Sequence, residues 1–297
     1  MKYKYKFTVF TPTYNRANLI HRVYESLEKQ TFRDFEWLIV DDGSKDNTKE
    51  VIEKFKKKAD FPIRYIYQKN GGKHRAFNKG VKEAKGEFFL TADSDDRFLS
   101  DALEKLKYYW DLIPENEKDN FSGVTGLCID QNGDIIGDKY PKDIFDSNSF
   151  KSTFIYKIKG EKWGFQRTDI LRKFPFKEFE GERFIAESSV WFEISRFYKT
   201  RYINEPLRIY EINEDSLSTN TINLRINNPQ GTIYTYSKDF ELPISLKYKI
   251  KSMINCLRFS FYKKELFFNC LKIQKKYLLP ILFPIGFLMY VKDNLKK

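Results

Sequence analysis

Residues 87–96 read EFFLTADSDD, an apolar run that ends in three carboxylates within four positions. Within residues 87–91, Phe88, Phe89 and Leu90 are consecutive apolar residues without alternation, which predicts a buried strand. The carboxylates Asp93, Asp95 and Asp96 repel one another unless a positive charge lies among them. At a strand end they can supply hard oxygen ligands to Mg²⁺ or Mn²⁺. The alternative is a polar turn that caps the next helix.

Three other strand-like runs precede this segment, and each is followed by a helical pattern. The runs cover residues 7–11, 35–40 and 63–67, and apolar residues at helical spacing follow at 19–27, 48–58 and 74–84. Strands alternating with helices at this spacing predict an α/β fold, with a mostly parallel twisted sheet flanked by helices on both faces. Another helix is expected up to Trp110, with Ser100 as its N-cap.

Polar clusters follow all four predicted strands. They are TPTYNR (11–16), VDDGS (40–44), NGGK (70–73) and DSDD (93–96). Ligands bind at the carboxyl ends of the strands in open parallel sheets, so we expect the four clusters to meet along one edge. The chain lacks a P-loop motif, and no G-x-G-x-x-G follows its first strand, which argues against a dinucleotide-binding domain.

The residue types in these clusters suit a nucleotide and its phosphates. Tyr14 can stack on a base, and Arg16 can meet a phosphate. One aspartate of the second cluster can accept a hydrogen bond from a nucleobase N–H. Gly71-Gly72-Lys73 offers backbone amides and an ammonium to a diphosphate. Because a turn explains each cluster taken alone, the prediction of a site depends on their convergence.

In this order and spacing, the four clusters resemble those of glycosyltransferase family 2, whose nucleotide half has the GT-A fold. The likeness is close over residues 7–96 and continues less clearly to about residue 215. It implies an inverting transfer from a nucleotide-diphosphate sugar, most often a UDP-sugar. The acceptor would be a hydroxyl of a glycan or lipid-linked glycan, as in cell-surface polysaccharide synthesis, and Mn²⁺ or Mg²⁺ would be the cofactor.

Together, the clusters and the resemblance predict a donor site. Its residues are Thr11, Pro12, Tyr14, Arg16, Asp42, Gly72, Lys73, Asp93 and Ser94. The resemblance implies Asp93 and Asp95 as metal ligands, and it gives Asp96 a role in supporting the loop or contacting the acceptor. Many relatives carry Ala-Arg-Asn after the glycine segment, where this chain has Ala76-Phe77-Asn78. Arg75 and Lys73 are the candidates to take the place of that arginine.

The reaction also needs a general base for the acceptor hydroxyl. Family members commonly place it in a Glu-Asp pair that begins a helix, and this chain has Glu187-Ser188, 92 residues after Asp95. We predict Glu187 as the catalytic base, with Glu182 and Glu193 as competitors. The alternative for Glu187 is a first-turn carboxylate of a helix over residues 187–198, favoured by the helix dipole.

The second half of the chain is harder to interpret. A hairpin is expected at residues 124–136, and a loop at 214–218 is a candidate cover for the donor phosphates. We divide the chain into a catalytic domain, 1–220, and a helical C-terminal extension, 221–297. Within the first, residues 1–120 are assigned to nucleotide-sugar and metal binding, and 121–220 to the acceptor side and the base.

The C-terminal extension is basic and apolar. The whole chain has a net charge of +12, and residues 245–297 carry +10 of it, from 12 Lys/Arg and 2 Asp/Glu. The apolar run at 277–291 is interrupted by two prolines and is shorter than the roughly 20 residues of a membrane span. These features predict an interfacial anchor on an anionic membrane. A subunit contact that forms an oligomer, or a cover over the catalytic core, is the alternative.

Composition and the N-terminal sequence bear on the cellular location and on the class of protein. With 41% hydrophobic residues the chain can build a core, and three widely spaced cysteines predict no disulfide framework or zinc site. The N-terminus shows no signal peptide, so we expect a cytoplasmic protein, peripheral on the inner face of the cell membrane. A nucleotidyltransferase and a catalytically inactive nucleotide-sugar binder are the alternatives. No nucleic-acid motif accompanies the basic charge, so no nucleic-acid partner is expected.

Overall fold

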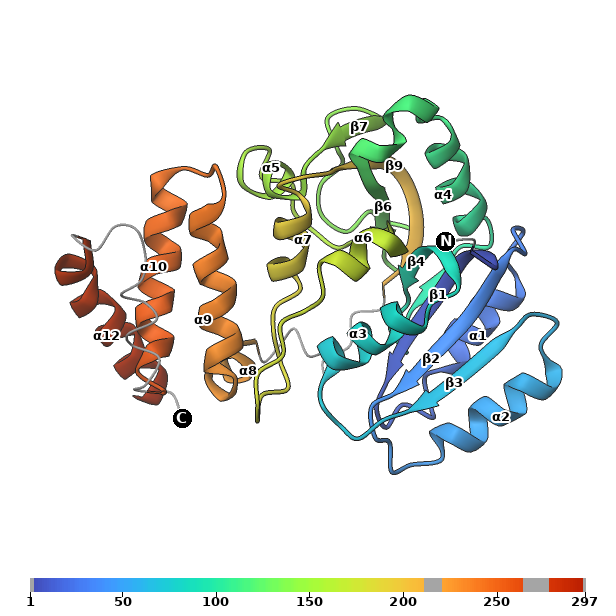
Figure 1. Cartoon of the computed structure of the whole chain (residues 1–297), viewed down its shortest axis with the longest axis horizontal. Helices are drawn as coiled ribbons and strands as arrows, with labels where there is room; N and C mark the ends of the chain where they lie inside the picture. The colour runs from blue at the N-terminus through green and yellow to red at the C-terminus, as the bar shows by residue number, and fades with distance from the viewer. Residues whose placement is uncertain (1–2, 211–220, 264–277, 296–297) are drawn as a thin grey trace. The chain divides into compact units, whose positions relative to one another are not determined.

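The computed structural model describes residues 3–210, 221–263 and 278–295, and the chain divides into two compact units (Figure 1). Unit 1 consists of Met1–Pro175 and Phe197–Asn213, and unit 2 of Phe176–Arg196 and Glu214–Lys297. Each unit has its own hydrophobic core. The loop expected at 214–218 lies outside the described residues.

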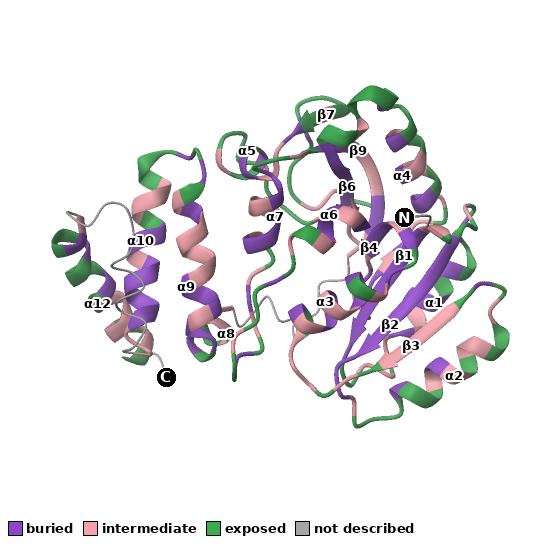
Figure 2. Ribbon diagram, in the orientation of Figure 1, coloured by how far each residue is buried: buried purple, intermediate pink, exposed green. Residues whose placement is uncertain are grey.

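The first half of unit 1 is the predicted parallel sheet. Its strands are β1 (Tyr5–Thr13), β2 (Phe35–Asp41), β3 (Ile63–Tyr67) and β4 (Gly86–Thr91). They pair in parallel in the order β3-β2-β1-β4, so their carboxyl ends share one edge. Strands β1 and β2 are buried along almost their whole length, as expected for a sheet covered on both faces (Figure 2).

The second half of unit 1 extends the same sheet with mixed pairing. Five further strands are β5 (Arg97–Phe98), β6 (Phe121–Ile129), β7 (Ile144–Ser147), β8 (Lys162–Arg167) and β9 (Lys199–Ile209). Strand β8 joins β4 to β6 in antiparallel fashion, β9 runs parallel to β6, and β5 and β7 pair antiparallel with β9. The expected hairpin is reduced to a single bridge between Ile129 and Ile135.

Helices cover both faces of this sheet. On one face, α1 (His21–Glu28), α2 (Thr48–Lys58) and α4 (Ala102–Asp111) contribute to the main core. On the other, α3 (Lys73–Glu83) packs Phe77 against Phe10 and Phe89, because alternate residues of a strand point to opposite faces. The α/β prediction is confirmed.

Short elements complete unit 1. They are η1 (Glu115–Asn120), α5 (Ser149–Phe154) and α6 (Thr168–Lys173). The prediction of Ser100 as the N-cap of α4 is wrong, because the helix starts at Ala102 and its N-cap residue is Asp101.

Unit 2 is helical. Its elements are α7 (Ser188–Ile194), α8 (Thr221–Asn227), α9 (Pro229–Lys238), η3 (Asp239–Glu241), α10 (Leu246–Ser260) and α12 (Leu279–Leu295). Helix α10 packs between α9 and α12, as Figure 1 shows. The helix expected over 187–198 ends at Ile194. None of the helices in the described parts of the chain is both long and apolar enough to cross a membrane.

The packing of unit 2 groups residues 176–196 with the C-terminal helices. Glu182 accepts hydrogen bonds from the backbone N–H groups of Gln230 and Gly231, both 2.8 Å long, at the first turn of α9. The Asn228 side-chain oxygen accepts bonds from the backbone of the same segment. The boundary at residue 220 stays a prediction for the catalytic domain.

Candidate active site

The four polar clusters of unit 1 are joined by hydrogen bonds and an ion pair at the carboxyl edge of the sheet. The loop after β1 contacts the loop after β2, because the Asn15 N–H donates to Ser44 Oγ (2.8 Å) and the Lys45 N–H donates to Asn15 Oδ1 (2.8 Å). Asn15 has a positive φ of 52°, which this short polar residue tolerates. The expected meeting of these loops is observed.

The first cluster exposes some of its residues and buries others. The Tyr14 side chain is exposed, and Arg16 lies close enough to Asp93 to affect its pKa. Thr11 is fully buried, and its hydroxyl accepts a 2.9 Å hydrogen bond from the Trp37 indole. Pro12 is also buried. The groups of this cluster that can meet a ligand are therefore Tyr14 and Arg16.

Asp42 holds the glycine loop. Its buried carboxylate accepts hydrogen bonds from the N–H groups of Gly71 (2.9 Å) and Gly72 (2.7 Å) and from the Gln68 side chain (2.7 Å). The two glycine amides expected to meet a diphosphate are thus engaged by Asp42. Gly72 has a φ of 97°, which favours glycine, so the loop is shaped by both residues.

The turn after β2 packs closely against the start of the glycine loop. Gly43 has a φ of 89°, and a Cβ added there would lie 2.8 Å from the Asn70 nitrogen. Neighbouring Asp41 accepts a bond from the Tyr65 hydroxyl (2.7 Å) and one from the Ser44 N–H (2.7 Å). The two aspartates of the VDDGS cluster therefore support two different loops.

Lys73 and Asp93 form the ion pair that joins the third and fourth clusters. The Lys73 Nζ lies 2.8 Å from Oδ1 and 2.9 Å from Oδ2 of Asp93, and both side chains are partly exposed. Burial raises the pKa of Asp93, but Lys73, Arg208 and Arg16 together lower it more, so the net pKa lies below the ordinary value. Lys73 contacts Asp93 directly, whereas Arg208 is buried against Asp96. The partly exposed ammonium of Lys73 therefore suits a site for an anionic ligand.

Asp96 faces inward. Its Oδ2 accepts a 2.9 Å hydrogen bond from the Asp93 N–H and lies 3.3 Å from the Arg208 guanidinium, and both side chains of this ion pair are buried. Burial raises the pKa of Asp96, and Arg208 opposes the rise. Of the two roles left open for Asp96, these contacts favour support of the loop. Ser94 is also buried.

Asp95 is the carboxylate of this loop that remains available. It is partly exposed, and its side chain forms no hydrogen bond or ion pair with another described residue. Among the described residues, no group of three His, Cys, Asp or Glu side chains is arranged to hold a metal ion. A site with one or two carboxylates fits Mg²⁺, which commonly takes its other ligands from substrate phosphates and water.

Phe77 occupies the position where many relatives have an arginine. Its ring is buried and packs at 5.9 Å from the Phe10 ring centroid. The Trp163 indole donates a 2.6 Å hydrogen bond to the Thr91 carbonyl, and its ring stacks on Phe98. Both residues therefore serve the core.

The predicted base, Glu187, belongs to unit 2, where it is exposed at the N-cap position of α7. Its competitors are engaged elsewhere. Glu182 binds the first turn of α9, and Glu193 pairs with Arg196 (3.2 Å) and Lys238 (3.5 Å). Of the three glutamates considered, Glu187 has the most exposed position.

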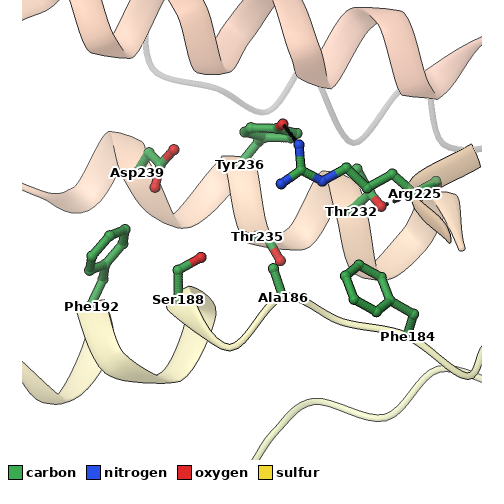
Figure 3. A pocket seen from close by; sticks show the side chains of 9 residues that line it. All are labelled: Phe184, Ala186, Ser188, Phe192, Arg225, Thr232, Thr235, Tyr236 and Asp239. Atoms are coloured by element: carbon green, nitrogen blue, oxygen red, sulfur yellow. Dashed lines mark hydrogen bonds between the residues drawn. The ribbon is translucent and has the colours of Figure 1, made fainter. Parts of the chain in front are cut away.

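A pocket lies beside Glu187 within unit 2, and Figure 3 shows it from close by. Its two sides are the segment from Phe184 to Phe192 and helix α9, and the Ser188 side chain points toward the helix. The space inside it that water can reach is about 70 Å³, so the pocket is small. The Arg225 guanidinium, on its rim, donates a 2.7 Å hydrogen bond to the Tyr236 hydroxyl. Its lining combines aromatic rings, hydroxyls and a cation, as ligand pockets do, but its volume is below their usual range of about 300–1,000 Å³.

Two contacts of the site were missed by sequence reasoning. Gln68 binds Asp42, and Arg208 binds Asp96 across 112 positions of sequence. No local pattern marks either partner, because each pairing is created by the sheet.

The chain matches the profile of Glycosyl transferase family 2 over residues 8–174. It is 31% identical over 219 residues to the GalNAc(5)-diNAcBac-PP-undecaprenol beta-1,3-glucosyltransferase of Campylobacter jejuni, covering 72% of this chain and 67% of the relative. It is 34% identical over 132 residues to the poly(ribitol-phosphate) beta-N-acetylglucosaminyltransferase TarS of Staphylococcus aureus. That match covers 42% of this chain and only 22% of TarS.

Solved structures show the same fold. TarS residues 1–349, in complex with UDP-GlcNAc, give a TM-score of 0.60 at 20% identity, covering 95% of this chain and 79% of that one. A mannosyltransferase from Pyrobaculum calidifontis, in complex with GDP-Man and Mn²⁺, gives 0.56 at 17% identity, covering 99% and 88%. Because the family profile spans more than half of the chain and all four strand-end clusters, the protein belongs to glycosyl transferase family 2, a family of enzymes.

Proposed function

We propose that the protein transfers a sugar, with inversion, from a nucleotide-diphosphate sugar to a hydroxyl of a glycan or lipid-linked glycan. A UDP-sugar is the proposed donor. The observation that carries the proposal is the Lys73–Asp93 ion pair, which joins the third and fourth clusters beside the partly exposed carboxylate of Asp95. An arrangement of this kind can receive a diphosphate and a divalent metal together.

In this proposal the site residues divide into those that touch the donor and those that shape its site. Tyr14 would stack on the base, and Arg16 and Lys73 would face the diphosphate. The Asp42 carboxylate would hold the glycine loop below them. The remaining donor-site residues would shape the loops and make no charged contact with the donor; they are Thr11, Pro12, Gly72 and Ser94.

Asp93 and Asp95 are the proposed ligands of Mn²⁺ or Mg²⁺. Carboxylate oxygens are ligands that these hard cations prefer, and Asp95 has no competing partner among the described residues. Bound there, the ion would neutralise charge on the leaving diphosphate. Lys73 pairs with Asp93 in this structure. When a metal ion binds Asp93 instead, the Lys73 ammonium would be released to pair with the diphosphate.

Glu187 is the proposed base. Its carboxylate would accept the proton of the acceptor hydroxyl while that oxygen bonds to the anomeric carbon of the sugar and the bond to the nucleoside diphosphate breaks. The neighbouring pocket of unit 2 is the proposed place for part of the acceptor, because Ala186 and Ser188, on either side of Glu187, line it.

The acceptor class is supported by the relatives. The Campylobacter enzyme is named for a glycan on PP-undecaprenol, and TarS for a polymer of ribitol phosphate. A lipid-linked acceptor would lie at the inner face of the cell membrane, so we propose a cytoplasmic enzyme that is peripheral there.

Thermal unfolding with a panel of nucleotide-sugars, with and without Mn²⁺, tests donor binding. We expect stabilisation by one nucleoside-diphosphate sugar that is larger when Mn²⁺ is present. No stabilisation by any nucleoside diphosphate would contradict the proposed donor site.

A Glu187→Gln variant tests the base and separates the enzyme from an inactive binder. We expect unchanged stabilisation by the donor and a loss of about a hundredfold or more in release of the nucleotide with lipid-linked glycan fractions. Glu193→Gln is the matched control, because its carboxylate is paired with Arg196 and Lys238. Full transfer by the Glu187→Gln variant would remove Glu187 from this role.

A further inference from the structure

Helix α12 is apolar on all sides, and among the described residues α10 is the helix that packs against it. Its buried residues are Leu279, Leu282 and Gly286, and they face α10. A Cβ added at Gly286 would lie 2.8 Å from Leu257 Cβ, so the two helices approach closely at this point. The contact is secured near the end of α12 by the ion pair between Asp293 and Arg258. The inner face of α12 is therefore fixed to unit 2.

The outer face carries large exposed hydrophobic side chains. Ile281, Ile285 and Leu288 are 67%, 42% and 66% exposed, and their spacing of four and then three residues places them in one row along the helix. Phe283 and Phe287 lie on another side of the helix, where both rings pack against Phe261 at the end of α10. Figure 2 shows much of α12 in the colour of exposed residues. A contiguous apolar face of this kind marks an interaction site.

The geometry of α12 suits a helix that lies in a bilayer surface. The helix has 17 residues, which at about 1.5 Å per residue gives roughly 25 Å, less than the hydrocarbon core of a bilayer. Pro284 lies inside it, and Lys292 and Asn294 are exposed toward its end. An apolar face with flanking cations is the pattern of interfacial helices.

The charge of this region selects the partner. Lys247 and Lys251 are exposed on α10, the helix that carries α12, and residues 245–297 have a net charge of +10. Anionic headgroups complement this charge. A second copy of the same face would bring two basic regions together, which disfavours self-association through α12.

We propose that the outer face of α12, centred on Ile281, Ile285 and Leu288, docks on an anionic lipid bilayer. The apolar row enters the boundary between headgroups and acyl chains, and the cations of the region contact the headgroups. The proposal deepens the proposed function by naming the surface that brings the enzyme to a lipid-linked acceptor, and for that purpose it rests on that function. Binding to lipid itself requires neither donor nor Glu187.

Flotation of the full chain with vesicles tests the proposal. The vesicles contain phosphatidylcholine with phosphatidylglycerol, or phosphatidylcholine alone. We expect binding to the anionic vesicles, weaker binding at high salt, and a loss of about tenfold or more in the Ile281→Ser/Leu288→Ser variant, since large apolar side chains dominate such insertion. The matched control is Tyr108→Ser/Leu112→Ser, which removes two exposed apolar side chains at the end of α4 in unit 1 and should bind like the unchanged chain.

A second variant keeps the face apolar. In Leu288→Trp, fluorescence should be quenched by brominated acyl chains, whereas a Tyr108→Trp control should not be. Thermal stabilisation by the nucleotide is measured in every variant and reports on the donor site alone. A defect of the donor site is therefore distinguishable from a loss of lipid binding.

Two results would overturn the inference. One is equal vesicle binding by the Ile281→Ser/Leu288→Ser variant and the unchanged chain. The other is a chain that ignores anionic vesicles but forms a dimer in analytical ultracentrifugation, with the dimer lost in the same variant. That second result would assign the face to another copy of the protein.

Discussion

Arg208 and Asp96 are the buried residues that set the position of the acidic loop. Asp96 receives the backbone N–H of Asp93 on the same carboxylate oxygen that faces Arg208. Neither side chain is placed to touch the donor directly, since both are buried. They act on the proposed metal ligands through the backbone, as outer partners of metal sites commonly do.

Replacing Arg208 with Met should therefore weaken the effect of Mn²⁺ on donor binding. We expect the Mn²⁺ concentration for half-maximal stabilisation to rise by about tenfold to a hundredfold. Breaking the buried pair should also cost roughly 3–5 kcal/mol of stability, whereas Arg208→Lys keeps the charge and should lose less. The measurement is thermal unfolding across a Mn²⁺ series with the nucleotide held constant. An unaltered Mn²⁺ requirement in Arg208→Met would show that the pair does not position the loop.

Removing the carboxylate of Asp95 should change metal binding, whereas removing that of Asp96 should change the stability of the free enzyme. Asp95→Ala should leave the free enzyme within about 0.5 kcal/mol of its original stability, because it breaks no contact among the described residues. It should also abolish the additional stabilisation that Mn²⁺ gives with the nucleotide. Asp96→Ala should destabilise the free enzyme, because it removes the buried carboxylate that pairs with Arg208 and leaves only the longer 3.7 Å contact to Glu161. The proposed division of roles fails if Asp95→Ala keeps its response to Mn²⁺.

At the scale of elements, the turn after α9 is joined to α10 by the side chain of Asp239, whose charged form is disfavoured by burial. Asp239, in the turn after α9, accepts a 2.5 Å hydrogen bond from the Ser252 hydroxyl of α10. Burial raises the pKa of Asp239 from 3.8 to about 6. A carboxyl whose pKa is raised by folding stabilises the folded state when protonated. Its contribution is complete at low pH and is lost as the pH rises through about 6.

The Asp239→Asn variant should therefore be more stable than the unchanged chain at neutral pH. Asparagine still accepts the Ser252 bond and carries no charge, so the gain at pH 7.5 should reach roughly 2–3 kcal/mol and should nearly vanish near pH 4. Urea unfolding at the two pH values measures the difference. Glu241→Gln, at a largely exposed ion pair, is the control and should change stability little. A gain that is the same at both pH values would exclude burial of the charge as its cause.

The elements show why part of the fold was predictable. The four strand-helix repeats of unit 1 are local patterns, and runs such as 35–40 and helical spacings such as 48–58 predict them well. Strand β5 has two residues and β7 has four, so neither is long enough to create a recognisable period. Both exist because β9 pairs with them.

The candidate site was predictable to a similar extent. The convergence of the clusters follows from parallel strands, but what each carboxylate binds does not. Asp42 engages the glycine amides and Glu182 binds the start of α9, and both pairings join residues at least 28 positions apart. Local sequence gives a carboxylate its charge, whereas the tertiary fold decides whether that charge meets a ligand or a backbone amide.

At the scale of the whole molecule, the chain enters unit 2 twice. It leaves unit 1 at Pro175, returns at Phe197, and leaves again after Asn213. Residues 176–196 therefore depend on helices that lie later in the sequence, and they include Glu187. The proposed donor site and the proposed base thus belong to different units that the same chain connects.

A chain that ends at Asn220 should separate donor binding from the integrity of this inserted segment. Unit 1 keeps its core and its carboxyl edge, so the truncated chain should still be stabilised by the nucleotide. Residues 176–196 lose α9, which supplies the Gly231 N–H to Glu182 and packs against α7. We expect cleavage within this segment to be at least about tenfold faster than in the full chain, because unsupported segments open at little free-energy cost.

Limited proteolysis followed by mass spectrometry locates the cuts, and nucleotide-dependent unfolding monitors unit 1 in the same samples. Asn228→Ala in the full chain is an intermediate control, because it removes the side-chain oxygen that binds the N–H groups of Arg183 and Phe184 while leaving α9 present. It should increase cleavage within 176–196 less than the truncation does. Equal protection of this segment in the full and shortened chains would mean that unit 1 alone holds it, and residue 220 would then be a sufficient boundary for the catalytic domain.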